Sequence, residues 1–210
     1  MQSVLRTQFV LPGRYPALAR QVVGYVLPIA VSAAAILLAR RGFTSWSGDA
    51  LLFFLLLPVI VILVTRKKVV DFGLRVGDWK KGTIAAVIGI LLSILVVGVA
   101  ASISPGVRSY YGSKTMSPKL VLDVFLYMFA WEFLLRGYLL LALQRRLGFK
   151  RANVLQTVVF FLAHTSKPAL EFYSTAFTGV LFGYVSDKTR SIYSMVAIHT
   201  AIYLSVVYFT

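Results

Sequence analysis

The chain has 210 residues, of which 59% are hydrophobic and only 14% are charged, and its mean hydropathy is +0.81. A soluble domain of this length cannot bury so much apolar surface, so the composition predicts an integral membrane protein. In a soluble protein, the net charge of +15 would suggest nucleic-acid binding. In a membrane protein we expect instead that basic loops lie against anionic lipid, and we expect no nucleic-acid partner.

Seven apolar runs near the roughly 20 residues that cross a hydrocarbon core follow one another along the chain. They cover residues 21–39, 49–65, 83–103, 119–143, 152–165, 169–186 and 192–210. We therefore predict an all-α integral membrane protein, a bundle of about seven transmembrane helices (between six and eight). No internal repeat or domain boundary interrupts residues 21–210, which we expect to form a single transmembrane domain with its motif-bearing core at 119–210.

Two basic segments lie outside these runs. Residues 1–20 carry Arg6, Arg14 and Arg20 before any apolar run, and we expect them to form a cytoplasmic tail. Residues 66–82, RKKVVDFGLRVGDWKKG, are basic, broken by glycine and faintly amphipathic. We expect this segment to lie along the lipid headgroups.

The distribution of basic residues predicts the orientation. Seven spans place the N-terminus on the same side as the connections after spans two, four and six. That side holds 15 Lys and Arg residues against 6 on the other side. The positive-inside rule therefore predicts a multi-pass protein of the cell membrane, with the N-terminus in the cytoplasm and the C-terminus outside.

Ionisable residues occur within several of the spans. Glu132 and Arg136 lie in the fourth span, His164 ends the fifth, Glu171 opens the sixth, and His199 lies in the middle of the last. Such groups are costly in hydrocarbon, by about 2.5 kcal/mol or more each, and by default they mark function or a partner. At 1.5 Å per helical residue, four helices bring these groups to a similar depth, roughly 14–22 Å from the cytoplasmic ends. The sequence therefore predicts one site.

Each of these residues also has a simpler explanation. Glu132 and Arg136, four residues apart on one helix face, fit a structural ion pair. His164, four residues before Pro168, fits the closing of a helix end. Glu171 fits the first turn of a helix, where a carboxylate suits the helix dipole. For His199 the alternative is a hydrogen bond to a neighbouring helix.

Three motifs in this order resemble the CAAX-protease and bacteriocin-processing family, also called Abi or type II CAAX prenyl endopeptidases. The family pattern is Glu-x-x-x-Arg-Gly in one span, Phe-x-x-x-His in the next and His-x-x-x-Asn in the last. Here the motifs are EFLLRG, FFLAH and HTAIY, which hold Glu132 and Arg136, His164, and His199 and Tyr203. The resemblance covers residues 119–210.

The sequence departs from the family pattern at two positions. Trp131 stands where the family usually has a first glutamate, taken as the residue that activates water, and Tyr203 stands in place of the asparagine. The patterns WEF-x-x-RG and His-x-x-Lys-Pro-x-x-Glu are similar to one branch of the family. In that branch Glu171 is the natural replacement carboxylate, unless Glu132 itself turns inward.

The resemblance implies hydrolysis of a peptide bond inside the bilayer. Glu132 or Glu171 would act as general base on a water, with His164 helping to orient or deprotonate that water. His199 and Tyr203 would hydrogen-bond the developing oxyanion. The expected catalytic set is thus Glu132, Arg136, His164, Glu171, His199 and Tyr203, where Arg136 anchors Glu132.

The expected partners are membrane lipids and a membrane-bound or lipidated peptide: a prenylated C-terminus, a double-glycine leader or a transmembrane segment. We expect no cofactor. The alternative is zinc held by His164, His199 and either Glu132 or Glu171, which are ligand types of catalytic zinc. No histidine pair, however, shows the close spacing of a zinc-binding helix.

Two other classes of function remain open. Trp131 favours a catalytically silent family member that acts by binding, as a bacteriocin-immunity factor or as the partner of a membrane protein. Glutamate and histidine at mid-depth also suit a small transporter or proton-relay protein. A transporter would predict inverted repeats, which the sequence does not show.

Overall fold

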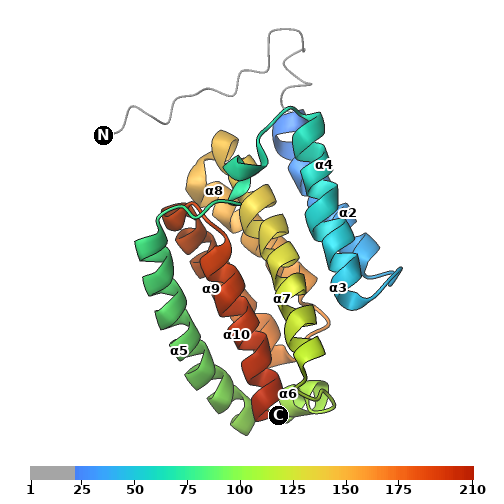
Figure 1. Cartoon of the computed structure of the whole chain (residues 1–210), viewed down its shortest axis with the longest axis vertical. Helices are drawn as coiled ribbons and strands as arrows, with labels where there is room; N and C mark the ends of the chain where they lie inside the picture. Colours follow the sequence, from blue (N-terminus) through green and yellow to red (C-terminus); the bar gives the residue numbers. More distant parts are fainter. Residues whose placement is uncertain (1–21) are drawn as a thin grey trace.

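The computed structural model describes residues 22–210, which are helical apart from short connections (Figure 1). The predicted tail, residues 1–20, lies outside the described residues. In the labels used here, η marks a π- or 3₁₀-helical segment. The elements are η1 Val22–Val26, α2 Leu27–Ala39, α3 Trp46–Asp49, η2 Ala50–Leu56, α4 Leu57–Val64, η3 Val69–Phe72, α5 Trp79–Ile103, α6 Pro105–Tyr111, α7 Pro118–Glu132, η4 Phe133–Leu139, α8 Leu140–Ala163, α9 Ala169–Thr189 and α10 Tyr193–Phe209.

The predicted fold class, an all-α membrane protein, is confirmed. Trp46–Val64, Trp79–Ile103 and Pro118–Ala163 are long and apolar enough to cross a membrane, and Gly24–Ala39 and Tyr193–Phe209 are shorter apolar helices. The stretch Pro118–Ala163 holds the predicted fourth and fifth spans. Gly148, at φ 74° and ψ 165°, breaks the helix between these two spans. This region of backbone space is open essentially to glycine alone.

The outermost helix, α5, shows how the sequence suits lipid. Of its 25 residues only Ser93 and Ala101 are buried, whereas large apolar side chains such as Leu95 remain exposed. An apolar surface of this extent marks contact with a membrane. The helix runs alongside α10 (Figure 1). The backbones approach so closely that a Cβ on Gly89 would overlap the side chain of Ile198.

The basic segment after α4 is more firmly docked than its sequence suggests. Val70, Val76 and Trp79 are exposed, as expected for a segment at the headgroups. Phe72, however, is 1% exposed and packs in the main hydrophobic core.

The end of this segment is fixed to the turn between α9 and α10. The backbone N–H of Asp78 donates to the carbonyl of Thr189 at 2.8 Å. Asp78 also caps α5, accepting from the backbone N–H of Lys81 at 3.1 Å. Hydrogen bonds from the side chain and backbone of Lys81 hold the pKa of the exposed Asp78 carboxyl below its ordinary value.

Buried amides join α8 to α9. Gly179 and Gly183 lie at a close contact between these two helices. Gln156 Nε2 donates to the carbonyl of Gly179 at 2.8 Å, and Asn153 Nδ2 donates to the carbonyl of Val180 at 3.0 Å. Small residues bring the two backbones within reach of these amides, which then hydrogen-bond in place of water.

The close contact between α8 and α9 predicts that Gly183→Ala will destabilise the protein. A Cβ at this position would overlap Asn153 Oδ1, so the amide must move and its bond to α9 weakens. We expect a loss of about 1–3 kcal/mol, as for other overpacked cores, seen as a lower midpoint of thermal unfolding in detergent.

The matched control is Gly106→Ala, because a Cβ there meets only Ser104 Oγ, at 4.0 Å. Its unfolding midpoint should stay close to that of the wild type. Equal midpoints for both variants would contradict the close contact between α8 and α9.

Candidate functional site

The candidate site begins at the junction of α7 and η4, where Glu132 and Arg136 are both 0% exposed. Helix α7 starts at a Ser117 cap, with Ser117 Oγ accepting from the backbone N–H of Leu120, and ends at Glu132. There the chain changes to the π-helical η4, which contains Arg136. Short π-helical segments are frequent at functional sites. Arg136 Nη1 donates to Glu132 Oε1 at 3.2 Å, so the predicted pairing is present.

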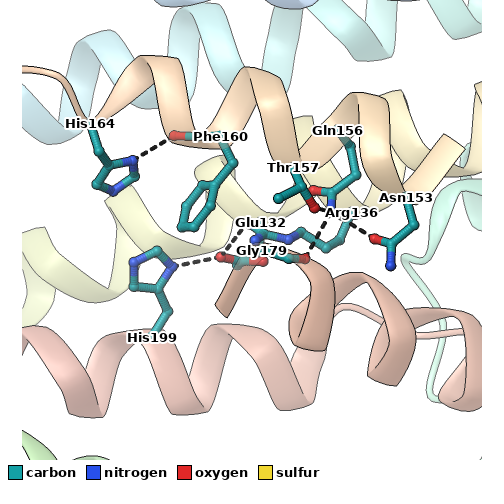
Figure 2. A network of polar contacts seen from close by, with 9 residues as sticks. All are labelled: Glu132, Arg136, Asn153, Gln156, Thr157, Phe160, His164, Gly179 and His199. Carbon is teal, nitrogen blue, oxygen red and sulfur yellow. Dashed lines mark hydrogen bonds and ion pairs between the residues drawn. The ribbon is translucent and has the colours of Figure 1, made fainter. Parts of the chain in front are cut away.

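His199, from α10, shares the same carboxylate oxygen. Its Nδ1 lies 2.6 Å from Glu132 Oε1 (Figure 2). A carboxylate only accepts, so the neutral imidazole carries its proton on Nδ1 and leaves an unprotonated Nε2. The histidine is thus hydrogen-bonded to a neighbouring helix, and the partner is a predicted site residue. Glu132 thereby fixes both the rotation and the tautomer of the His199 ring.

His164 ends α8, as the following proline predicts. It is the residue directly after the helix, at φ −99° and ψ 10°. Its Nδ1 lies 2.8 Å from the carbonyl oxygen of Phe160. A carbonyl also only accepts, so this imidazole too carries its proton on Nδ1 and leaves Nε2 as an acceptor. Figure 2 shows the two imidazoles at the same end of the polar network.

Phe160 explains the Phe-x-x-x-His spacing. The centre of its ring lies 4.5 Å from the His164 ring and 6.0 Å from the His199 ring. The guanidinium carbon of Arg136 lies 4.2 Å from the same ring centre. One side chain therefore spaces the two imidazoles and also stacks with the buried cation.

A cavity of about 550 Å³ lies against the two histidines. Both His164 and His199 line it, together with Trp131, Glu171 and Tyr203. Glu132 and Arg136 do not line it, so they lie behind the imidazoles. The cavity wall is largely aromatic and aliphatic. An apolar cavity with a few convergent polar groups is typical of a small-ligand or peptide site.

Glu171 lies on this cavity wall but has partners of its own. Tyr111 Oη donates to Glu171 Oε2 at 2.8 Å, and Lys167 Nζ lies 3.6 Å from Oε1. Lys167 Nζ also donates to Tyr111 Oη at 3.0 Å. No hydrogen bond between Glu171 and either histidine occurs among the described residues. The expected single cluster is therefore two clusters that face one cavity.

Tyr203 and Trp131 both lie on the cavity wall. Tyr203 is 8% exposed, one turn after His199, and its ring lies 5.6 Å from that of Tyr111. The Trp131 ring lies 5.9 Å from that of His164, edge to face. Tryptophan thus occupies the cavity wall beside His164.

Within residues 22–210, no three His, Cys, Asp or Glu side chains converge as a metal-binding group. Of the two glutamates in the alternative zinc set, Glu171 is hydrogen-bonded to Tyr111 and lies 3.6 Å from Lys167, whereas Glu132 is hydrogen-bonded to His199.

Sequence reasoning missed Tyr111. It belongs to the short helix α6, which none of the predicted spans includes, and no motif of the chain contains it. Its part in the site depends on a contact 60 residues along the chain. The only local signal was a pair of tyrosines, Tyr110 and Tyr111, in a connection.

Comparison with known proteins agrees with the motifs. Residues 113–205 match the model of the Rce1-like family, described as type II CAAX prenyl endopeptidase Rce1-like. The matched range includes every predicted catalytic residue. No curated protein and no solved structure gives a significant match to the chain. The segment from residue 113 to residue 205 is therefore similar to the Rce1-like type II CAAX prenyl endopeptidases, and it forms part of the helical membrane fold described above.

Proposed function

We propose that the protein is an intramembrane endopeptidase that hydrolyses membrane-bound or lipidated peptides with an activated water. One observation carries the proposal. Two imidazoles, one directly after α8 and one on α10, line an apolar cavity with their Nδ1 atoms hydrogen-bonded, which leaves Nε2 of each neutral ring unprotonated, and a buried carboxylate holds one of them. Positioned bases of this kind typically contribute 10²–10⁴-fold to a rate.

The burial of Glu132 separates the roles of the two glutamates. Glu132 is sealed behind His199, so we assign it to positioning that histidine, with Arg136 as its counter-ion. Of the two candidate bases, Glu171 is the one on the cavity wall, where a water and a peptide both have access. In the proposed reaction the proton of the attacking water passes to Glu171, with His164 Nε2 orienting the water, and Glu171 then returns this proton to the leaving amine as the C–N bond breaks.

We assign the stabilisation of the oxyanion to two residues of α10. In the form in which His199 has taken a second proton from solvent at Nε2, it can donate a hydrogen bond to the tetrahedral oxygen. Its partner Glu132 Oε1, at 2.6 Å, stabilises the resulting imidazolium. Tyr203 supplies a second donor from the next turn of the helix. Such donors are worth roughly 2.7–4 kcal/mol each in other hydrolases.

The shape of the cavity supports an amphipathic substrate. Val96, Val99 and Ile103, exposed on the lipid-facing helix α5, also line the cavity. Two cations, Arg40 and Lys167, line it as well. An apolar chain therefore has access along α5, while a polar or anionic peptide end meets the two cations.

One observation favours a second candidate, a peptide-binding protein without hydrolysis. Trp131 occupies the position of the family's first glutamate and packs beside His164, and it cannot accept a proton. In this alternative the cavity holds a peptide that no base attacks.

We further propose that the N-terminus lies in the cytoplasm and the C-terminus outside. The proposal rests on the basic residues that gather at one end of the helices, among them Arg66, Arg145 and Lys188. The cavity lies near the other end of the bundle, where α6 and the start of α9 line it. The site would then open toward the outer half of the bilayer.

The proposed roles predict the activity of single variants toward a library of quenched hydrophobic and prenylated peptides in nanodiscs. His164→Ala, His199→Ala and Glu171→Gln should each lower kcat/KM by about 100-fold or more, since each removes a proposed proton acceptor or donor. Glu132→Gln should also lower it, because the buried partner of His199 is lost.

The matched control is Asp123→Asn, which changes a carboxylate to an amide on α7, outside the cavity lining, where Asp123 accepts from Ser47 and Lys119. It should cleave at close to the wild-type rate. No cleavage by a folded, monodisperse wild type would contradict the proposal and favour the binding protein.

The orientation predicts which introduced thiols react in whole cells. The natural chain has no cysteine, so Lys114→Cys and Lys150→Cys each create the only thiol, both at exposed positions. A membrane-impermeant maleimide should label the Lys114→Cys variant in intact cells. The Lys150→Cys variant should react only after permeabilisation. The reverse pattern would show the opposite orientation.

A further inference from the structure

The short helix α6 closes one end of the cavity and is held firmly in place. Ser104 caps it by accepting from the backbone N–H of Val107 at 3.3 Å. Arg108 Nη1 donates to the carbonyls of Ala101 and Ser102 at 2.6 and 2.7 Å, which ties α6 to the end of α5. Its last residue, Tyr111, is 2% exposed.

The ring and the hydroxyl of Tyr111 have different surroundings. The ring packs in an apolar cluster with Val107, Val124, Met128 and Tyr203, which a phenylalanine would fill equally well. The hydroxyl makes two hydrogen bonds, accepting from Lys167 Nζ at 3.0 Å and donating to Glu171 Oε2 at 2.8 Å. Packing therefore requires the ring alone, whereas the hydroxyl acts on the cavity carboxylate.

Without such partners the side chain of Glu171 would be poorly fixed. It lies in the first turn of α9 with 27% of its side chain exposed, and a glutamate at such a place has several rotamers available. Tyr111 hydrogen-bonds to Oε2, and Lys167 lies beside Oε1. Both carboxylate oxygens are therefore oriented by residues that precede α9 in the chain. Figure 1 shows α6 at the end of the bundle, below α7 and beside the lower end of α10.

We propose that Tyr111 is a positioning residue for hydrolysis, holding the Glu171 carboxylate in its working orientation on the cavity wall. This inference rests on the proposed function, in which Glu171 accepts the proton of the attacking water. Tyr111 itself does not react, because its hydroxyl is already engaged on both sides by Lys167 and Glu171. Helix α6, which closes one end of the cavity, thereby becomes part of the site.

The test is Tyr111→Phe, with Tyr184→Phe as the matched control. Tyr184 lies on α9, outside the cavity lining, and its hydroxyl makes no hydrogen bond among the described residues. Tyr111→Phe should lower kcat about 10-fold or more while KM stays within about twofold, because orientation and not binding is lost. Tyr184→Phe should leave both constants near the wild type.

A spectroscopic measurement separates positioning from a structural effect. Glu132 and Glu171 are the only glutamates in the chain, so ¹³C-carboxyl labelling of glutamate gives two signals, assigned with Glu171→Gln. Tyr111→Phe should move the Glu171 signal and leave the Glu132 signal in place. An unmoved Glu171 signal, or a moved signal with unchanged kcat, would overturn the proposal for Tyr111 alone. An inert wild type would overturn the proposed function and this inference together.

Discussion

The structure depends on one carboxylate that is fully removed from water. Glu132 Oε1 accepts from Arg136 and from His199, and the glutamate and arginine are both 0% exposed. A buried ion costs several kcal/mol, and loss of one partner from a buried pair typically costs about 3–5 kcal/mol. The charge therefore has to be matched by residues in fixed places. Arg136 comes from the segment just after α7 and His199 from α10, so the bond to His199 also fixes α7 against α10.

This constraint divides the polar residues into two groups with different surroundings. The buried carboxylate of Glu132 does not line the cavity, and its role is to set the tautomer of His199. The cavity carboxylate, Glu171, has access but lies with Tyr111 and Lys167 on the other side of the space. In the proposed mechanism the imidazoles lie between Glu132 and Glu171. The pairing of Glu132 with His199 resembles the general arrangement in which a carboxylate orients a histidine. Because Trp131 occupies the position of the family's first glutamate, α7 presents no acidic side chain to the cavity, and in the proposed mechanism the task of the base moves to α9.

Local patterns in the sequence were enough to predict the helices and the local parts of the site. Apolar run length gave the spans, Pro168 gave the end of the helix at His164, and the four-residue spacing gave the contact between Glu132 and Arg136. Each of these features depends on residues within one or two turns of each other.

Contacts between distant segments were beyond such reasoning. Whether Glu132 faces the cavity depends on the ring of His199, 67 residues away, and the partner of Glu171 is a tyrosine 60 residues earlier. Phe72 is buried beside Tyr138 of η4, with ring centres 6.0 Å apart, and the change to π-helix after Glu132 has no signature in the residues themselves. The roles of the two glutamates could therefore be narrowed only by the fold.

The protonation of the two imidazoles is the most direct test of the proposed mechanism. His164 and His199 are the only histidines, so ¹⁵N-histidine labelling gives two rings whose nitrogen shifts report which nitrogen carries the proton. In neutral rings of the wild type, both should carry the proton on Nδ1 and leave Nε2 bare, and Glu132→Gln should alter the His199 ring alone. A proton on Nε2 of either neutral ring would contradict the geometry from which the mechanism is derived.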